Sequence, residues 1–452
     1  MTGLIQYNMS DTKLESPGDK ISPTFCILPW IHLNTWPNGN VYPCCLTDYR
    51  EELGNMKDNT LEELWNVPRM KEIRRDMLLG NKHDNCRKCY QQEENGLDST
   101  RTSSNRWYKH HIPNIIEQTK PDGTNERFEL LYWDFRFSNL CNFKCRMCGS
   151  YLSSKWFEDE IKIFGGSNIP KAIINVNDYS KKDIKFYLNE FMEDVEEIYF
   201  AGGEPLIMDE HYYILEKLIE IGHTDLRLRY NTNLGYLKFK KWDNLKLWEP
   251  FRKVDNANVA IFASIDGINE VAEYKRKGTK WPKVEANIKK CIDEGLNFHV
   301  SCTTSIMNIF HIPTFVDRMV ELGLDIFHIQ LNNILTSPYY YNINILPIEL
   351  KNKVKILYNK HLEKFQGREK EELAKKYDSI FKFMDDLKEI KQMVDDQKPR
   401  YTIVDKCNEK IAFYQKEVDE FEAWAEAESQ KDAYLEGTDI HDSSDSPILA
   451  HP

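Results

Sequence analysis

The sequence predicts an α/β protein in which parallel strands alternate with helices, with a small cysteine-bearing module before this core and a helical extension after it. The alternation is predicted by six short runs of β-branched and aromatic residues, which amphipathic segments separate. Parallel strands need such crossovers, so the sheet is either open or a partial barrel. The separate cysteine-bearing module is predicted by another observation, because most of the eleven cysteines stand in short groups.

Residues 1–20 form a predominantly polar stretch without periodicity, for which we expect disorder. The predicted cysteine-bearing module covers residues 21–108. Within it LEELWNVPRMKEIRRDMLLG, residues 61–80, has apolar residues at helical spacing. The stretch from Lys109 to Arg127 is predicted to be a polar connector to the core.

The predicted core covers residues 128–340. Its six strand-like runs are ELLYWDFRFS, VEEIYFAGG, LRLRYNTN, NVAIFASIDG, NFHVSCTTS and DIFHIQLNN. Between them HYYILEKLIEIG, WPKVEANIKKCIDEG and IPTFVDRMVELG each end at glycine, as helices often do. Ligands of such folds bind beyond the carboxyl ends of the strands. Chemically distinctive residues stand there: a cysteine loop follows the first run, GGEP the second, NTN the third and SIDG the fourth.

Residues 346–430 are rich in Lys and Glu with a helical pattern, which predicts solvated helices flanking the barrel. Residues 431–452 are predicted to be disordered. Three cysteines stand alone, and we expect each to be a buried structural thiol: Cys291, Cys302 and Cys407.

The chain has 60 basic and 72 acidic residues, a formal net charge of −12, which disfavours non-specific binding to nucleic acid or to anionic membranes. No apolar run approaches about 18 residues, and the N-terminus lacks the apolar core of a signal peptide. We therefore expect a cytoplasmic protein without a membrane or nucleic-acid partner. In that reducing compartment clustered cysteines are metal ligands rather than disulfides.

Residues 141–148, CNFKCRMC, bring together Cys141, Cys145 and Cys148. A structural zinc site takes four ligands, usually as two pairs, whereas this run supplies three. An iron–sulfur cube held by three thiolates keeps one iron open for another ligand. The spacing therefore favours an iron–sulfur cluster.

This C-x3-C-x2-C loop after the first strand resembles the hallmark of the radical S-adenosylmethionine (SAM) superfamily, and the resemblance extends over residues 128–340. It implies a partial (β/α)6 barrel of the TIM type and a [4Fe-4S] cluster on Cys141, Cys145 and Cys148 whose open iron binds SAM. Family members cleave SAM reductively to methionine and a 5′-deoxyadenosyl radical, which takes a hydrogen atom from the substrate. The resemblance also implies an electron donor such as flavodoxin or ferredoxin.

Later motifs follow the order found in the family. AGGEP resembles its GGE motif, and the resemblance implies that polar residues at the third and fourth strand ends face the cofactor or substrate, with Ser264 or Asp266 near the ribose. Arg276 is placed like the arginine that pairs with the methionine carboxylate. Met147 stands where the family usually has an aromatic residue against the adenine. The implied SAM-binding residues are Met147, Gly202, Gly203, Glu204, Pro205, Asn231, Asn233, Ser264, Asp266 and Arg276.

A second cysteine set has the spacing C-x12-G-x4-C through Gly39, followed by C-x2-C. It resembles the twitch module, a shorter relative of the SPASM domain, and so implies an auxiliary [4Fe-4S] cluster. Cys45 is an alternative ligand to Cys44, although the spacing from Gly39 favours Cys44. A zinc knuckle is the competing interpretation. Such modules commonly follow the radical core, whereas this one precedes it. The implied ligands are Cys26, Cys44, Cys86 and Cys89.

The sequence therefore predicts a radical SAM enzyme with two clusters that oxidises, crosslinks or epimerises a peptide or protein. The auxiliary cluster either anchors the substrate through an open iron or accepts an electron from it, and four cysteine ligands favour the second role. Alternatives are radical oxidation of a small molecule such as an amino sugar or nucleotide, radical modification of RNA, and a non-enzymatic, zinc-stabilised binding protein.

Overall fold

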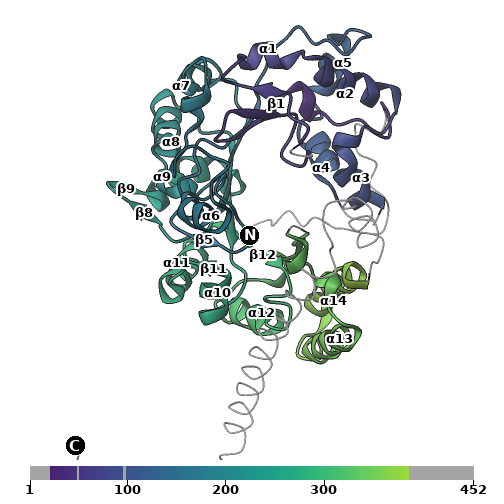
Figure 1. Cartoon of the computed structure of the whole chain (residues 1–452), viewed down its shortest axis with the longest axis vertical. Coiled ribbons are helices and arrows are strands. Elements are labelled where there is room, and N and C mark those ends of the chain that lie inside the picture. The colour runs from purple at the N-terminus through teal and green to yellow at the C-terminus, as the bar shows by residue number, and fades with distance from the viewer. Residues whose placement is uncertain (1–20, 48–49, 95–97, 337, 386–452) are drawn as a thin grey trace, which may run out of the picture. The chain divides into compact units, whose positions relative to one another are not determined.

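A computed structural model describes residues 21–47, 50–94, 98–336 and 338–385 (Figure 1). The chain divides into two compact units, Met1–Asp385 and Asp386–Pro452, and every described residue belongs to the first. The predicted disordered ends, the helical extension beyond residue 385 and Cys407 lie outside the described residues.

The core of this unit is a nine-stranded sheet with the order β13-β12-β10-β7-β6-β4-β1-β2-β3. Neighbouring strands from β13 to β1 run parallel, while β2 and β3 are antiparallel to their neighbours. The strands are β1 (His32–Thr35), β2 (Asn40–Tyr42), β3 (Gly54–Asn55), β4 (Tyr132–Phe135), β6 (Glu197–Phe200), β7 (Arg227–Thr232), β10 (Val259–Ser264), β12 (Asn297–Thr304) and β13 (Ile329–Ile334). Two short pairs lie outside this sheet: β5 (Lys144–Cys145) with β11 (Arg276–Lys277), and β8 (Lys238–Phe239) with β9 (Trp242–Asp243).

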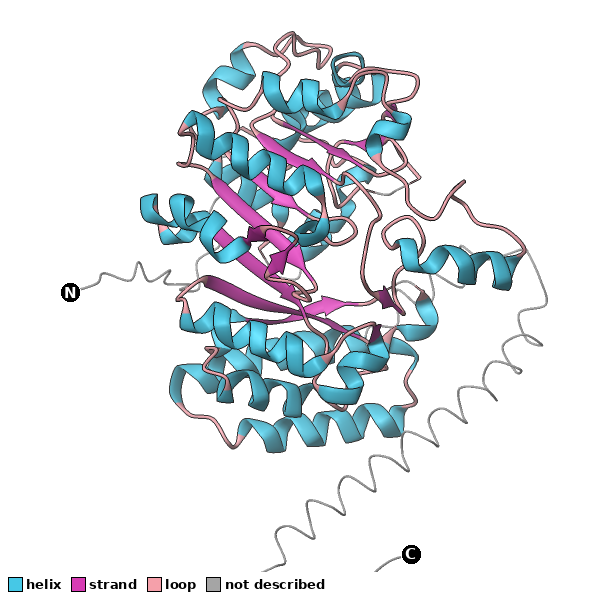
Figure 2. Cartoon of the chain, turned by 90° about the vertical axis from the view of Figure 1, so that its left-hand side faces the viewer, coloured by secondary structure: helices cyan, strands magenta, loops and turns pink. Residues whose placement is uncertain are grey.

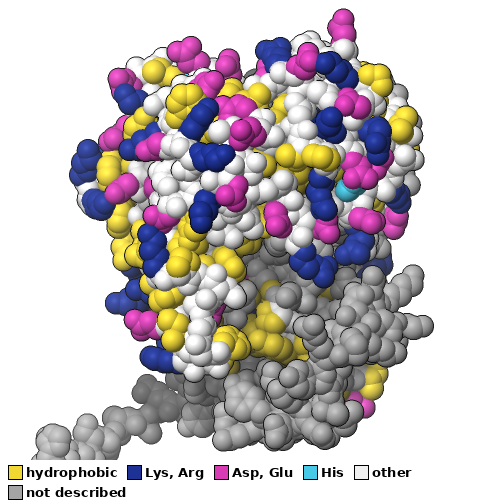
Figure 3. All heavy atoms as spheres, turned by 45° about the horizontal axis from the view of Figure 1, so that its top comes forward, with side chains coloured by type: hydrophobic (Ala, Val, Ile, Leu, Met, Phe, Trp, Pro, Cys, Tyr) yellow, Lys and Arg dark blue, Asp and Glu magenta, His cyan; other side chains and the backbone are white. Residues whose placement is uncertain are grey.

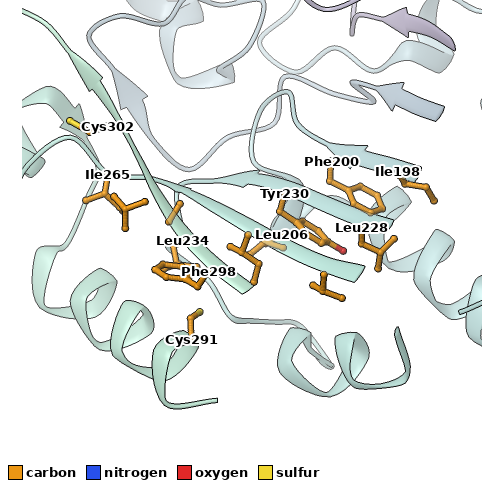
Figure 4. Packing of buried hydrophobic residues seen from close by; sticks show 14 of the residues in the cluster. Ile198, Phe200, Leu206, Leu228, Tyr230, Leu234, Ile265, Cys291, Phe298 and Cys302 are labelled. Carbon is orange, nitrogen blue, oxygen red and sulfur yellow. The ribbon is translucent and has the colours of Figure 1, made fainter. Parts of the chain in front are cut away.

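The six predicted core strands are confirmed as β4, β6, β7, β10, β12 and β13. Along β10 and β12 fully buried residues alternate with half-buried ones, as the period of two in a strand requires. The fully buried set packs against helices on what we call the outer face; Figure 4 shows this packing, with Phe298 of β12 close to Cys291 of a covering helix. The opposite, inner face is more polar. It carries Asp134, Tyr199, Arg229, Phe262 and His299.

Helices lie over the outer face (Figures 1 and 2). The helix after β6 begins with Asp209 and Glu210 and ends at Gly222 in the left-handed conformation, φ 75°, as its glycine predicted. The core helices are α6 (Phe157–Phe164), α7 (Ile184–Glu190), α8 (Asp209–Ile221), α9 (Asn244–Val254), α10 (Asn269–Lys275), α11 (Trp281–Asp293) and α12 (Ile312–Glu321).

The N-terminal module is continuous with the core. Its strand β1 pairs in parallel with β4, with His32 opposite Tyr132 and Asn34 opposite Asp134. The single helical pattern over residues 61–80 becomes two helices, because Val67 before Pro68 is extended (ψ 154°). The module helices are α1 (Leu61–Trp65), α2 (Pro68–Leu79), α3 (Arg87–Glu94) and α4 (Thr100–Trp107).

The prediction of a polar connector between Lys109 and Arg127 is wrong. Residues Ile112–Glu117 form helix α5, whose Ile112 and Ile115 are buried in the hydrophobic core of the module. Two apolar residues three positions apart form a short helical stripe, and a polar sequence around them obscured it. The segment therefore belongs to the module.

The helical extension is confirmed as far as residue 385. It comprises α13 (Ile348–Leu362) and α14 (Gly367–Asp385), and α14 packs on the edge strand β13 through residues such as Tyr377 and Ile380. Charged side chains of both signs are interspersed over the face shown in Figure 3. Among the described residues, no helix is long and apolar enough to cross a membrane.

Candidate functional site

Cys141, Cys145 and Cys148 lie in the loop that follows β4. Strand pairing and hydrogen bonds fix the position of this loop. Strand β5 within it pairs with β11, which sets Arg276 opposite Cys145. The buried Asn139 amide donates to the carbonyl of Ser150 at 2.8 Å, and the Ser153 hydroxyl donates to the carbonyl of Phe143 at 2.6 Å. The loop is thus a fixed element rather than a free connection.

The sulfurs of the described cysteines are not drawn together as a single zinc ion would hold them. A zinc–sulfur bond of about 2.3 Å puts the sulfurs of a tetrahedral site roughly 3.8 Å apart. Among the described residues, no three cysteine sulfurs lie within 4.8 Å of one another. Burial raises the pKa of Cys141, Cys145 and Cys148, so the thiols are neutral until a metal displaces their protons.

The GGEP segment after β6 packs against the cysteine loop. A Cβ on Gly203 would stand 2.2 Å from the carbonyl oxygen of Leu140, the residue before Cys141. The Glu204 amide donates to that same oxygen at 2.8 Å. The glycine therefore permits a close approach between two backbones, whereas the sequence had indicated close approach to a ligand.

The Glu204 carboxylate is buried and takes its hydrogen bonds from the protein. Its oxygens accept from the Thr232 hydroxyl at 2.6 Å, from the Asn233 amide at 2.7 Å and from the Leu206 amide at 3.1 Å. Burial raises its pKa to about 7, although these hydrogen bonds lower it. Glu204 thus joins the second and third strand ends beside the cysteine loop.

Arg276 is held by Asp266 and points toward Cys145. Its Nε and Nη2 donate to the two carboxylate oxygens of Asp266 at 2.7 and 3.1 Å, and Nη1 donates to the Cys145 sulfur at 3.8 Å. Asp266 is fully buried and also accepts from the Thr303 amide at 2.7 Å. Lys275 lies 3.7 Å from the same carboxylate. On the Cys141 side, the Asn233 amide group donates to the sulfur at 3.9 Å.

A cavity of about 310 Å³ opens beside the three cysteines, within the size range of small-molecule sites. It brings together eight of the ten predicted SAM-binding residues and leaves out Pro205, which is buried, and Asp266, which lines an adjoining space of about 10 Å³. The eight are Met147, Gly202, Gly203, Glu204, Asn231, Asn233, Ser264 and Arg276.

Sequence reasoning missed several residues that line this cavity. Tyr199 and Ala201 precede Gly203 at alternate positions of the second strand run, so the period of two could have placed them on the same face. Arg136 continues the alternation of β4 beyond Asp134, to which it donates at 3.3 Å. The others are Phe143, Leu152 and Ser153.

The second cysteine group gathers around the start of the module. Burial raises the pKa of Cys26 and of Cys44. Cys45 raises the pKa of Cys44 further, and Cys89 and Cys86 raise that of both, so Cys89 and Cys86 lie within electrostatic reach of Cys26 and of Cys44. The loop at Cys26 is fixed by α4, whose Asn105 accepts from the Ile27 amide at 2.8 Å and donates to the Phe25 carbonyl at 2.8 Å.

Cys44 and Cys45 face different surroundings. Cys44 packs against the hydrophobic cluster that contains Cys26, and Cys86 packs against the same cluster. Burial raises the pKa of Cys45 to about 11. Asp134 raises this pKa too, Arg136 and Arg229 lower it, and Cys89 raises it, so this thiol lies near the charges of the inner face as well as near Cys89. Gly39, which sets the spacing to Cys44, has φ 82° in the turn between β1 and β2.

A charged group on the inner face lies on β6 and β7. The buried Glu197 accepts from Arg227 through Nε at 2.9 Å and Nη2 at 2.6 Å, from Nη1 of Arg229 at 3.0 Å and from the Tyr108 hydroxyl at 3.2 Å. Burial raises the pKa of Glu197, but the two arginines outweigh it and hold the pKa below its usual range. The carboxylate is therefore charged at neutral pH.

Comparison with protein families gives one match over the three-cysteine core and another over the N-terminal cysteine group. The Radical SAM superfamily model matches residues 135–322, and the model of SPASM, an iron–sulfur cluster-binding domain, matches residues 26–90. The SPASM match precedes the radical SAM match, as the cysteine spacing predicted. Comparison with curated proteins gives no significant match.

Solved structures with similarity to the chain include anSMEcpe with bound AdoMet and Cp18Cys peptide, at 17% identity and a TM-score of 0.32, covering 50% of this chain and 58% of that one. SuiB of Streptococcus suis is 12% identical with a TM-score of 0.33, covering 66% and 64%. SuiB bound to the precursor peptide SuiA is 11% identical with a TM-score of 0.33, covering 65% and 63%. The chain spans less than two thirds of the length of each of these structures.

Proposed function

Because the chain belongs to the radical SAM superfamily and carries a SPASM iron–sulfur domain before its core, we propose that it cleaves SAM reductively and uses the resulting radical to modify a peptide or protein. The observation that carries the proposal is the 310 Å³ cavity, because three cysteines of one loop and residues from three successive strand ends line it together. A three-thiolate [4Fe-4S] cluster there supplies an open iron for SAM and the electron that breaks its carbon–sulfur bond.

We assign Cys141, Cys145 and Cys148 as the ligands of this cluster. Hydrogen bonds to ligand sulfurs raise the reduction potential of an iron–sulfur cluster. Asn233 and Arg276 donate such bonds to Cys141 and Cys145, and Asp266 fixes the orientation of Arg276. These residues are expected to ease reduction of the cluster.

We assign binding of SAM to the cavity-lining residues. The backbone of Gly202 and Gly203, the amides of Asn231 and Asn233 and the hydroxyl of Ser264 offer donors and acceptors to the polar groups of SAM. The thioether of Met147 is a polarizable contact for the adenine. The proposed role of Glu204 is to hold the strand ends in register, since its oxygens are already bonded to Thr232 and Asn233.

We assign Cys26, Cys44, Cys86 and Cys89 as ligands of an auxiliary [4Fe-4S] cluster. The electrostatic effect of Cys86 and Cys89 on both Cys26 and Cys44 supports a common site, and the packing of Cys44 against the hydrophobic cluster that contains Cys26 favours Cys44 over Cys45. Four thiolate ligands leave no open iron, so the proposed role of this cluster is to accept the electron released when a substrate radical is oxidised. A flavodoxin or ferredoxin is the proposed donor to the first cluster.

The substrate is proposed to be a peptide or protein segment, in line with the peptide-modifying relatives of the SPASM module. The inner face offers half-buried polar side chains from several strands, which suits a substrate of several residues. Oxidation of a small molecule is the second candidate. RNA modification is disfavoured by the net charge of −12.

The proposal is tested by anaerobic reconstitution with iron and sulfide, addition of SAM and dithionite, and quantification of 5′-deoxyadenosine and methionine. We expect both products from the parent protein and neither from Cys145→Ala, because a cluster with two protein ligands does not assemble stably. Cys291→Ala is the matched control, since Cys291 is also buried but packs in the core of the outer face. Equal product from Cys145→Ala and the parent would refute the assignment.

A further inference from the structure

We propose that the inner face binds a carboxylate group of the substrate through Arg229. This inference rests on the proposed function and narrows its substrate class to molecules that carry a carboxylate next to the site of hydrogen abstraction.

Arg229 lies next to the cavity in which the radical is proposed to form. It precedes Asn231, a cavity-lining residue, by two positions on the same face of β7, a separation of about 7 Å. The guanidinium lies 5.5 Å from the ring of Tyr199, another cavity-lining residue, and 5.7 Å from the ring of Phe262. These rings on β6 and β10 flank it on the inner face, so a group bound to Arg229 borders the SAM cavity.

Arg229 retains donors that the fold does not use. Arg227 directs Nε and Nη2 to Glu197, stacks over Trp107 at 4.0 Å and leaves only 20% of its side chain exposed. Among the described residues, Arg229 donates one hydrogen bond, from Nη1 to Glu197. Its side chain is 43% exposed. A guanidinium has five N–H donors, so Arg229 can bind a planar carboxylate with the others.

The charges around Arg229 leave a positive excess. The nearby arginines are Arg136, Arg227 and Arg229, and the facing carboxylates are Asp134 and Glu197. His299 of β12 adds no charge at neutral pH, since burial lowers its pKa to about 4. One unbalanced positive charge fits a monoanion, and the fork of donors matches a carboxylate.

Two sources can supply this carboxylate: an acidic side chain or the C-terminus of a peptide. The test uses fluorescently labelled probes with cluster-loaded, SAM-bound protein. The first probe is acetylated and amidated Ala-Ser-Glu-Ser-Ala, the second is its twin with Gln in place of Glu, and the third is the Gln twin with a free C-terminal carboxylate. Binding is measured by anisotropy for the parent, Arg229→Gln and Arg318→Gln. Arg318 is a matched control because it is 37% exposed and paired with Glu285, on the outer helix α12.

We expect the parent to bind one carboxylate probe about 10- to 100-fold more tightly than the uncharged twin, the range for a charge-assisted bond. Arg229→Gln should abolish this difference and Arg318→Gln should keep it. Preference for the Glu probe identifies a side chain, and preference for the third probe identifies a C-terminus. Iron content and circular dichroism establish that Arg229→Gln is folded, and Arg229→Lys should retain part of the preference.

The inference is overturned if neither carboxylate probe binds more tightly than the uncharged twin up to millimolar concentration, or if Arg229→Gln keeps the preference. Formation of 5′-deoxyadenosine in the same preparations separates this failure from failure of the proposed function. SAM cleavage without a charge preference refutes the carboxylate site alone. Absence of SAM cleavage in the loaded parent refutes the function on which it rests.

Discussion

Replacement of Asp266 by alanine is expected to lower the free energy of unfolding by about 3–5 kcal/mol, the cost of removing one partner from a buried ion pair. Asp266 and Lys275 have fully buried side chains, and Arg276 donates twice to the Asp266 carboxylate. The substitution leaves both cations without their countercharge, although Lys275 keeps its hydrogen bond to the Thr303 carbonyl, and the Thr303 amide loses its acceptor. Urea denaturation under anaerobic conditions, followed by circular dichroism, measures the effect.

The matched control is Asp293→Ala on the exposed face of α11. Asp293 pairs with Lys289 one helical turn away and its side chain is 57% exposed, so its removal should change the free energy of unfolding by less than about 0.5 kcal/mol. A loss for Asp266→Ala no larger than that of the control would show that the buried pair does not stabilise the fourth strand end.

Replacement of Gly203 by alanine is expected to displace the cysteine loop and to remove the SAM-binding cluster. The new Cβ would stand 2.2 Å from the Leu140 carbonyl oxygen and 2.8 Å from the carbonyl carbons of Asn139 and Leu140, so the backbone before Cys141 must move. Such overpacking costs about 1–3 kcal/mol or more. Reconstituted protein should contain about four iron atoms per chain rather than about eight, because one [4Fe-4S] cluster is lost.

Gly149→Ala tests whether any added methyl group in this loop has the same effect. Gly149 follows Cys148, and a Cβ there would meet Glu160 at 3.5 Å, an ordinary contact. We expect this variant to assemble both clusters. Two results would contradict the explanation that Gly203 is required by the close approach of the two backbones. One is full iron content in Gly203→Ala, and the other is an equal loss of iron in Gly149→Ala.

Local patterns in the sequence predicted most of the core. The six strand runs and the glycine-terminated helices depend on periods of two and 3.6, and these periods are properties of neighbouring residues. Parallel strands then bring their carboxyl ends to one edge. That rule predicts Gly203, Asn231 and Ser264 around the cysteine loop, and the cavity brings them together there.

Pairings between distant residues could not be predicted in this way. The parallel pairing of β1 with β4 joins segments about a hundred residues apart, and a four-residue strand of mixed polarity carries no signal for it. The partners of Asp266 and Glu204 are also non-local: the sequence indicated ligand contacts, whereas their carboxylates bond to Arg276 and to Thr232. A buried carboxylate takes whatever donors the fold brings close, and only the fold identifies them.

The open iron of the three-cysteine cluster is the central claim, and electron paramagnetic resonance of the dithionite-reduced Cys86→Ala/Cys89→Ala variant tests it most directly. This variant keeps only two of the four auxiliary ligands, so its remaining signal should come from the cluster on Cys141, Cys145 and Cys148. We predict that SAM shifts the g values of this signal, because its amine and carboxylate bind the open iron. An unchanged signal at saturating SAM, or the same shift in Cys145→Ala, would contradict the account.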